Sequence, residues 1–187
     1  MNYFALFLVF FIVPVAAGNV PVQPQSRGEA RIDQLFGQLK QAQTPEDAKP
    51  IEEEISVIFM QSGSPSVDLL MTRAESAAAG GDKDAARQIL DDVTKIAPDF
   101  AEGWHRRAAA QLADDDNEGA MVSLQRVILL NPREFRAMSE LADMLDDYGD
   151  KSTALKLYRR AIALDPKLRG AGARLKALEV EVEGQRI

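Results

Sequence analysis

Few side chains in this sequence could perform chemistry. It contains one histidine, His105, and no cysteine, which removes disulfides, thiol nucleophiles and cysteine-type metal sites. An enzyme would need a nucleophile with its base, a set of metal ligands or paired carboxylates in a pocket, and the sequence also lacks a glycine-rich phosphate loop. We therefore predict a protein that is not an enzyme and has no catalytic, cofactor-binding or metal-binding residues.

Two polar features have both a chemical and a structural interpretation. Asp114, Asp115 and Asp116 resemble a divalent-metal cluster, but aspartate also favours turns and helix caps, and a solvated turn is the simpler interpretation. His105 could be a pH-dependent switch, or it could be one polar residue of a binding surface. We adopt the structural interpretation for both features.

The charge balance restricts the class of partner. The 187 residues include 22 Lys and Arg against 29 Asp and Glu, a formal net charge of −7. Phosphate binding needs a basic patch, so this balance argues against a nucleic-acid partner. The length suits one domain plus a targeting segment and is sufficient for a substantial core.

The N-terminal segment 1–17 differs from the rest of the chain. Residues 4–15 are almost wholly apolar, and small residues follow before Gly18, a pattern typical of a cleaved signal peptide. The first three residues carry no Lys or Arg, so an uncleaved N-terminal anchor is the alternative. In both cases we expect an exported body, with membrane contact only if residues 1–17 are retained. Residues 18–28 are predicted to be a linker.

An internal repeat predicts the architecture. Pro98, Pro132 and Pro166 follow similar residues and are evenly spaced along the sequence. Turn residues recur with nearly the same spacing, at Gly81-Asp82, Asp116-Asn117 and Gly149-Asp150, between stretches of helical apolar spacing. Each unit is therefore expected to be a helix, a tight turn and a second helix that a proline ends.

Helical hairpins with a period of about 34 residues resemble the tetratricopeptide-repeat (TPR) family. The units are residues 67–100, 101–134 and 135–168, and the third matches the family pattern best, at Met138, Leu141, Ala142, Leu145, Ala154, Tyr158, Ala161 and Pro166. The resemblance implies an all-α fold, a right-handed TPR helical-hairpin solenoid. Small residues allow the paired helices to approach closely, and each hairpin completes its core only against its neighbours.

Two arginines depart from the family pattern. Arg73 and Arg107 stand where the family usually has leucine, and the stacking of repeats would bring them near one another. Their stems could pack while the guanidinium groups reach solvent or an acid such as Glu75 or Asp114, or they could form an anion site. Trp104 is interpreted as a core residue rather than a ligand platform.

The segments flanking the repeats are predicted to be helical. Residues 29–66 contain two amphipathic stretches, with a proline and a capping box opening the second, and suggest a degenerate TPR-like hairpin. This hairpin could cap the solenoid, or it could be a dimerisation or docking element. Residues 169–187 are predicted to form a C-terminal capping helix with a weak first turn.

The TPR resemblance also implies a binding groove lined by the first helix of each repeat. The residues that fall at groove positions and are candidates for partner binding are Met71, Glu75, His105, Arg106, Leu112, Arg136, Ser139, Glu140 and Asp143. The carboxylate clamp of some TPR co-chaperones is not present, because Met71 and Glu75 replace its first Lys and Asn. An extended peptide held by mixed polar and apolar contacts is the expected ligand.

The chain also resembles small exported TPR proteins of Gram-negative bacteria, particularly alphaproteobacteria. This resemblance implies a non-enzymatic scaffold or adaptor in the periplasm that binds a protein or peptide segment in its groove. Two alternatives are a periplasmic chaperone-like binder of many clients and a membrane-tethered protein that self-associates as a homo-oligomer.

Overall fold

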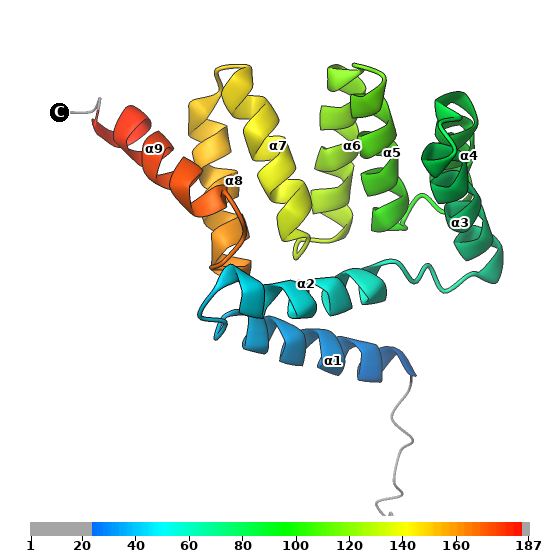
Figure 1. Ribbon diagram of the computed structural model, residues 1–187, viewed down its shortest axis with the longest axis horizontal. Coiled ribbons are helices and arrows are strands. Elements are labelled where there is room, and N and C mark those ends of the chain that lie inside the picture. Colours follow the sequence, from blue (N-terminus) through cyan, green and yellow to red (C-terminus); the bar gives the residue numbers. More distant parts are fainter. Residues whose placement is uncertain (1–23, 185–187) are drawn as a thin grey trace, which may run out of the picture.

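The computed structural model describes residues 24–184, which fold into helices joined by short turns and contain no strand. Figure 1 shows the helices as successive antiparallel pairs, followed by a single final helix. Their bounds are α1 (Pro24–Leu39), α2 (Pro45–Phe59), α3 (Pro65–Ala79), α4 (Lys83–Ile96), α5 (Ala101–Ala113), α6 (Asn117–Leu130), α7 (Phe135–Asp147), α8 (Lys151–Leu164) and α9 (Ala171–Glu183). The all-α helical-repeat prediction is confirmed.

Aspartates at the turns begin the second helix of each repeat. Asp82, Asp116 and Asp150 are the N-caps of α4, α6 and α8, and each side chain accepts a hydrogen bond from a backbone amide in the first turn of its helix. A carboxylate at this position satisfies a free N–H and interacts favourably with the helix dipole. The same helices end just before Pro98, Pro132 and Pro166, because proline cannot continue a helix.

Alanines at the helix contacts explain the close pairing within the repeats. Ala86, Ala108, Ala120, Ala142 and Ala154 are all buried, with exposed fractions of 2% or less. The larger side chains form two separate cores among the described residues. One joins α1 and α2 to α5–α9, and a smaller one, around Val67 and Val93, holds α3 and α4 together.

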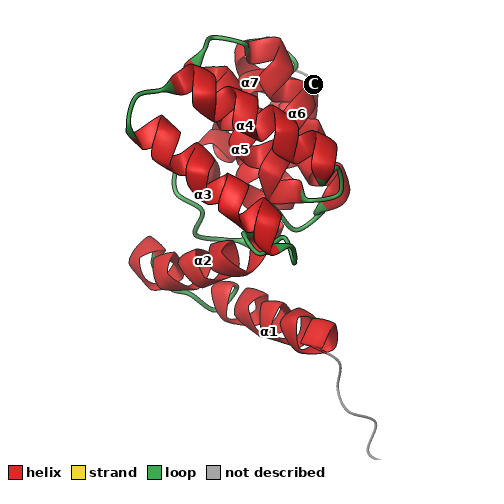
Figure 2. Cartoon of the chain, turned by 90° about the vertical axis from the view of Figure 1, so that its right-hand side faces the viewer, coloured by secondary structure: helices red, strands yellow, loops and turns green. Residues whose placement is uncertain are grey.

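The N-terminal hairpin does not have the position of an end cap. Figure 1 shows α1 and α2 lying beneath the lower ends of α5–α8 instead of stacking on α3 and α4, and Figure 2 shows them below the repeats from a second direction. Phe36 of α1 packs edge-on against Phe135 of α7, with 6.2 Å between ring centroids. Arg133 donates to Asp33 at 2.6 Å, and its guanidinium lies 4.1 Å from the Phe36 ring centroid.

The C-terminal helix α9 packs against the last repeat. Leu178 is buried, and ion pairs join Lys151 to Glu181 and Arg159 to Glu183. The helix begins at Ala171, directly after Gly170, which adopts a φ of 82° that favours glycine. None of the helices in residues 24–184 is long and apolar enough to cross a membrane.

The two unusual arginines lie in different environments. Arg107 donates to Asp91 at 2.6 Å and to Ser123 Oγ at 3.1 Å, and its guanidinium lies 5.5 Å from the Trp104 ring centroid. Arg73 is exposed. Of the two acids suggested for these arginines, Asp114 lies 3.7 Å from Arg87 and Glu75 lies 3.5 Å from Arg106. Arg107 therefore stabilises the contact between the helices of adjacent hairpins, and Trp104 packs against the main core.

Candidate functional site

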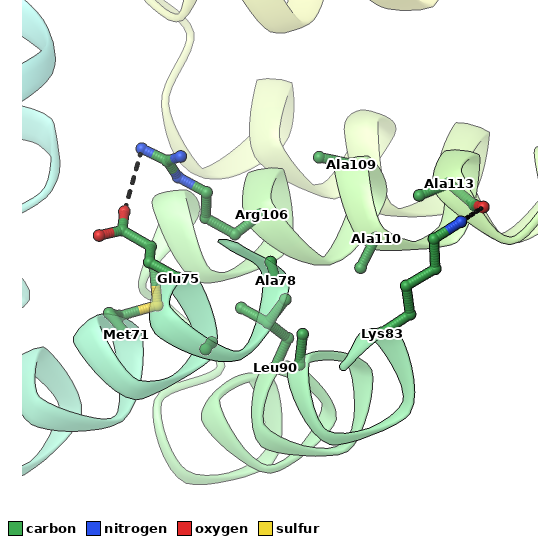
Figure 3. Close-up of a pocket in the computed structure, with 11 residues that line it drawn as sticks. Met71, Glu75, Ala78, Lys83, Leu90, Arg106, Ala109, Ala110 and Ala113 are labelled. Atoms are coloured by element: carbon green, nitrogen blue, oxygen red, sulfur yellow. Dashed lines mark hydrogen bonds and ion pairs between the residues drawn. The ribbon is translucent and has the colours of Figure 1, made fainter. Parts of the chain in front are cut away.

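The first helices of the repeats line two adjoining hollows. The first, here called the apolar hollow, has a volume of about 240 Å³ and lies between the α3–α4 hairpin and α5 (Figure 3). Its lining is mostly alanine with a few larger apolar side chains, and comprises Met71, Ala74, Glu75, Ala78, Lys83, Ala86, Leu90, Arg106, Ala109, Ala110 and Ala113. Small side chains on both facing helices leave this space open, so it can accept an apolar side chain from outside.

Charged side chains stand at the rim of the apolar hollow. Figure 3 shows Glu75 and Arg106 facing each other on one side, 3.5 Å apart, and Lys83 on the other. The Lys83 ammonium donates to the carbonyl oxygen of Ala113, the last residue of α5, at 2.9 Å. The hollow therefore combines an apolar floor with polar groups at its rim, the arrangement found in ligand pockets.

The second, here called the polar hollow, adjoins the first and shares Arg106 and Ala109 with it. Its volume is about 210 Å³, and its lining is mostly charged: Ser56, Glu102, His105, Arg106, Ala109, Glu134, Arg136 and Glu140. Ser56 belongs to α2, so the N-terminal hairpin forms one wall of this hollow. Together the two hollows form one strip along the inner face from the first repeat to the third.

His105 lies between two carboxylates at the centre of the polar hollow. Its Nε2 is 3.0 Å from Glu140 Oε2, and its Nδ1 is 3.5 Å from Glu102 Oε2. Burial alone would lower the pKa of His105, but the hydrogen bonds to Glu102 and Glu140 outweigh it and raise the pKa to about 10. The imidazole is therefore a cation at neutral pH in this arrangement.

The carboxylates around His105 differ in their environment. Burial raises the pKa of Glu102, but the hydrogen bond to His105 has the opposite effect, and the net result is a lowered pKa. Arg106 Nε also donates to Glu102 Oε1 at 2.7 Å. Glu134, the N-cap of α7, is 5% exposed, and burial raises its pKa. The neighbours of Glu102 thus stabilise its ionised form, whereas the ionised form of Glu134 is less well stabilised against the cost of burial.

Arg136 binds the N-terminal hairpin. Its guanidinium donates to the carbonyl oxygen of Glu52 at 2.7 Å and to Ser56 Oγ at 3.2 Å, both on α2. The neighbouring Arg106 contacts the same hairpin through Met60 Sδ at 3.7 Å. This part of the groove is thus closed on one side by the chain itself, which the repeat pattern does not predict because the hairpin lies outside the repeats.

The sequence-predicted groove residues fall into two groups. Six line the hollows: Met71, Glu75, His105, Arg106, Arg136 and Glu140. Three do not: Leu112 and Ser139 lie outside both linings, and Asp143 accepts a hydrogen bond from the Tyr158 hydroxyl. Glu102 falls at a groove position of the family pattern, and its spacing Glu102-x-x-His105 places both side chains on one helix face. The groove prediction missed Glu134.

The stacked hairpins and their hollowed inner face define a helical-repeat solenoid. The tetratricopeptide-repeat family model matches residues 68–99. A TPR repeat-containing protein of Rhizobium etli is 32% identical over 179 residues, which cover 94% of this chain and 88% of that protein. The chain belongs to the tetratricopeptide-repeat family.

Solved structures share this fold at low sequence identity. MamA is 19% identical with a TM-score of 0.57, over 89% of this chain and 88% of that chain. The first TPR of Spaghetti (RPAP3), bound to an HSP90 peptide, is 18% identical with a TM-score of 0.57, over 63% of this chain and 93% of that chain. The Yersinia enterocolitica type III secretion chaperone SycD, in complex with a peptide of the translocator YopD, is 15% identical with a TM-score of 0.57. This match covers 63% of this chain and 95% of that chain.

Proposed function

We propose that this chain is a non-enzymatic scaffold of the bacterial cell envelope, which binds a segment of a partner protein along its inner face. The observation that carries the proposal is the apolar hollow of about 240 Å³ between α3 and α5, with Glu75, Arg106 and Lys83 at its rim. A bulky apolar side chain of the partner fills the hollow, and polar groups of the partner's backbone meet the rim.

Two structural neighbours support a peptide ligand. The RPAP3 repeat is bound to an HSP90 peptide, and SycD is in complex with a peptide of YopD. In this chain α2 closes one side of the polar hollow through Arg136, so the partner segment lies mainly over the first two repeats. The partner's anchor is apolar rather than a carboxylate, because Met71 and Glu75 occupy the positions of the clamp's Lys and Asn.

The envelope setting is inferred from residues 1–17, which lie outside the described residues. Their apolar run is typical of a signal peptide, and the proposed location is the periplasm, with an inner-membrane anchor as the alternative. N-terminal sequencing of the protein purified from its host's envelope distinguishes the two. A mature chain that starts near Gly18 supports export with cleavage, whereas a chain that retains residues 1–17 supports the tethered, self-associating alternative.

A matched pair of variants tests the binding site. Ala78 and its neighbour Ala79 are both exposed, but only Ala78 lines the apolar hollow, and Ala79 lies outside both linings. Ala78→Phe fills the hollow and is expected to weaken the capture of envelope partners by tenfold or more, because a partner side chain loses its pocket. Ala79→Phe adds the same ring to the same helix and should leave capture unchanged.

The comparison is made by quantitative crosslinking pull-down from the host envelope with both variants and the unchanged chain. One dominant partner that is lost only with Ala78→Phe supports the scaffold. Partners that both variants capture equally would remove the apolar hollow as the binding site. Many weakly captured clients, all reduced by Ala78→Phe, would instead favour the chaperone-like alternative.

A further inference from the structure

The polar hollow contains a donor set that partner binding does not require. One ligand atom from each of Glu102, His105 and Glu134 can be chosen so that all three lie within 4.8 Å of one another. Glu102 and Glu134 are only 6% and 5% exposed, and the His105 side chain is 14% exposed. Carboxylate and imidazole groups that converge in a buried hollow are the donors of Zn²⁺ sites in proteins.

Regular backbone structure holds each of these donors. Glu102 and His105 are three residues apart on α5, so both side chains leave the same face of the helix. A Glu-x-x-His spacing on a helix supplies ligands to metal sites in helical bundles for this reason. Glu134 is fixed at the N-cap of α7, where it accepts a hydrogen bond from the Arg136 amide at 3.4 Å.

The orientation of the imidazole matches that of a metal ligand. Its Nε2 is 3.0 Å from Glu140 Oε2, which leaves Nδ1 on the side of Glu102, 3.5 Å from Oε2. Metal-binding histidines commonly donate their other ring N–H to a carboxylate, which fixes the tautomer and increases the basicity of the ligating nitrogen. Glu140 is placed to do this for His105.

Glu134 is a buried carboxylate that lacks a compensating side-chain donor. Within residues 28–184, the Glu134 carboxylate accepts one long hydrogen bond, from the backbone amide of Arg136 at 3.4 Å, and no side chain donates to it. Arg136 directs its guanidinium to Glu52 and Ser56 of α2, and Arg106 holds the other oxygen of Glu102. A buried carboxylate is normally paired or bound to a metal, so a cation at this position would account for Glu134.

We propose that Glu102, His105 and Glu134 form a binding site for Zn²⁺, with Glu140 orienting the imidazole and water completing the coordination. His105 binds through Nδ1 as the neutral imidazole and releases its proton when the ion enters. Zn–N and Zn–O distances of about 2.0–2.2 Å require the three donors to draw together by roughly 1 Å. The ion would connect α5 to the start of α7 and so fix the junction between the second and third repeats.

The test uses the untagged full chain, treated with chelator and dialysed, and then titrated with ZnCl₂ by calorimetry with the bound metal quantified. One Zn²⁺ per chain and a raised melting temperature are expected. His105→Ala and Glu134→Gln should each weaken binding at least tenfold, and Glu140→Gln by about tenfold to a hundredfold, as for other residues that orient metal ligands. Circular dichroism of the metal-free variants confirms that they fold.

A control variant separates this site from adventitious binding at the acidic turn. Asp115→Asn alters the Asp114–Asp116 turn and should leave the affinity unchanged. X-ray absorption at the zinc edge should show one nitrogen donor that disappears in His105→Ala. The proposal is overturned if the unchanged chain binds no stoichiometric Zn²⁺, or if binding survives His105→Ala and is lost in Asp115→Asn.

Discussion

The position of the N-terminal hairpin depends strongly on one side chain, Phe36, and its removal has a calculable cost. Phe36 is 3% exposed, and its ring contacts Phe135 with 6.2 Å and Phe59 with 6.5 Å between centroids. The Arg133 guanidinium lies 4.1 Å from the same ring. Truncation of a buried phenylalanine to alanine costs about 3–5 kcal/mol, which includes the lost aromatic contacts and the cavity.

Phe36→Ala should therefore lower the free energy of unfolding by about 4 kcal/mol, a large part of the roughly 5–15 kcal/mol typical of a domain. Urea unfolding followed by far-ultraviolet circular dichroism measures the change. Leu69→Ala is the control, since Leu69 is 53% exposed and its truncation should cost no more than about 0.5 kcal/mol.

Hydrogen exchange shows where the loss falls. Amides of α1 and α2 should lose protection in Phe36→Ala, because the main core joins these helices to α5–α9 through this ring. A loss below about 1 kcal/mol, or unchanged protection in α1, would refute the docking of the hairpin on the repeats.

Three further substitutions test other parts of the fold. Burial raises the pKa of Asp165, whose side chain is fully buried, so its ionised form is unfavourable in the folded state. Asp165→Asn should therefore stabilise the protein by roughly 1–2 kcal/mol at pH 7, as measured by urea unfolding. This gain in stability should shrink as the pH falls through the raised pKa of Asp165. Ala154→Trp should cost about 3 kcal/mol or more by overpacking the third repeat, and a native-like melting curve would contradict the assigned repeat register. Gly119→Ala should lower the melting temperature through a loss of about 1 kcal/mol, because a Cβ would collide with the capping Asp116 side chain, whereas the exposed Gly172→Ala should not.

Asn131 occupies the position in the second repeat that Asp165 occupies in the third, so it shows what Asp165→Asn would do. Both precede the proline that follows the second helix, and each side chain accepts a hydrogen bond from a backbone amide two residues on, at 2.9 Å for Asp165 and 3.0 Å for Asn131. Asparagine keeps this bond without a charge. The variant therefore removes the buried charge and its repulsion of Glu52, whose pKa is raised by burial and by Asp165. Equal stability of the two proteins at pH 7 would mean that the Asp165 carboxylate is already neutralised by its neighbours.

The fold was predictable because the repeat is encoded locally. The evenly spaced prolines, a capping aspartate at each interhelix turn and alanines at the helix contacts each act within one hairpin or between adjacent hairpins. The place of the N-terminal hairpin was not predictable in the same way. It depends on pairs such as Asp33 with Arg133, which are separated by 100 residues and are not part of the repeat pattern.

The candidate site was predictable only where it follows the repeat. Three residues at family groove positions, Met71, Glu75 and Arg106, line the apolar hollow. The hollow itself arises from small side chains, since the residues of α3 and α5 that line it include Ala74, Ala78, Ala109, Ala110 and Ala113. Glu134 was missed because it lies at a helix cap, outside the helical positions that the groove pattern counts.

The two hollows differ in what they offer a partner protein. The apolar hollow has small walls and open space, whereas the polar hollow is filled with charges that already satisfy one another, except at Glu134. A partner gains more by burying an apolar side chain in the first than by competing for Arg136, which α2 already holds. Reversal of the charge of Arg136 would therefore act first on the hairpin and only through it on the partner, and Ala78→Phe remains the variant that probes the binding surface alone.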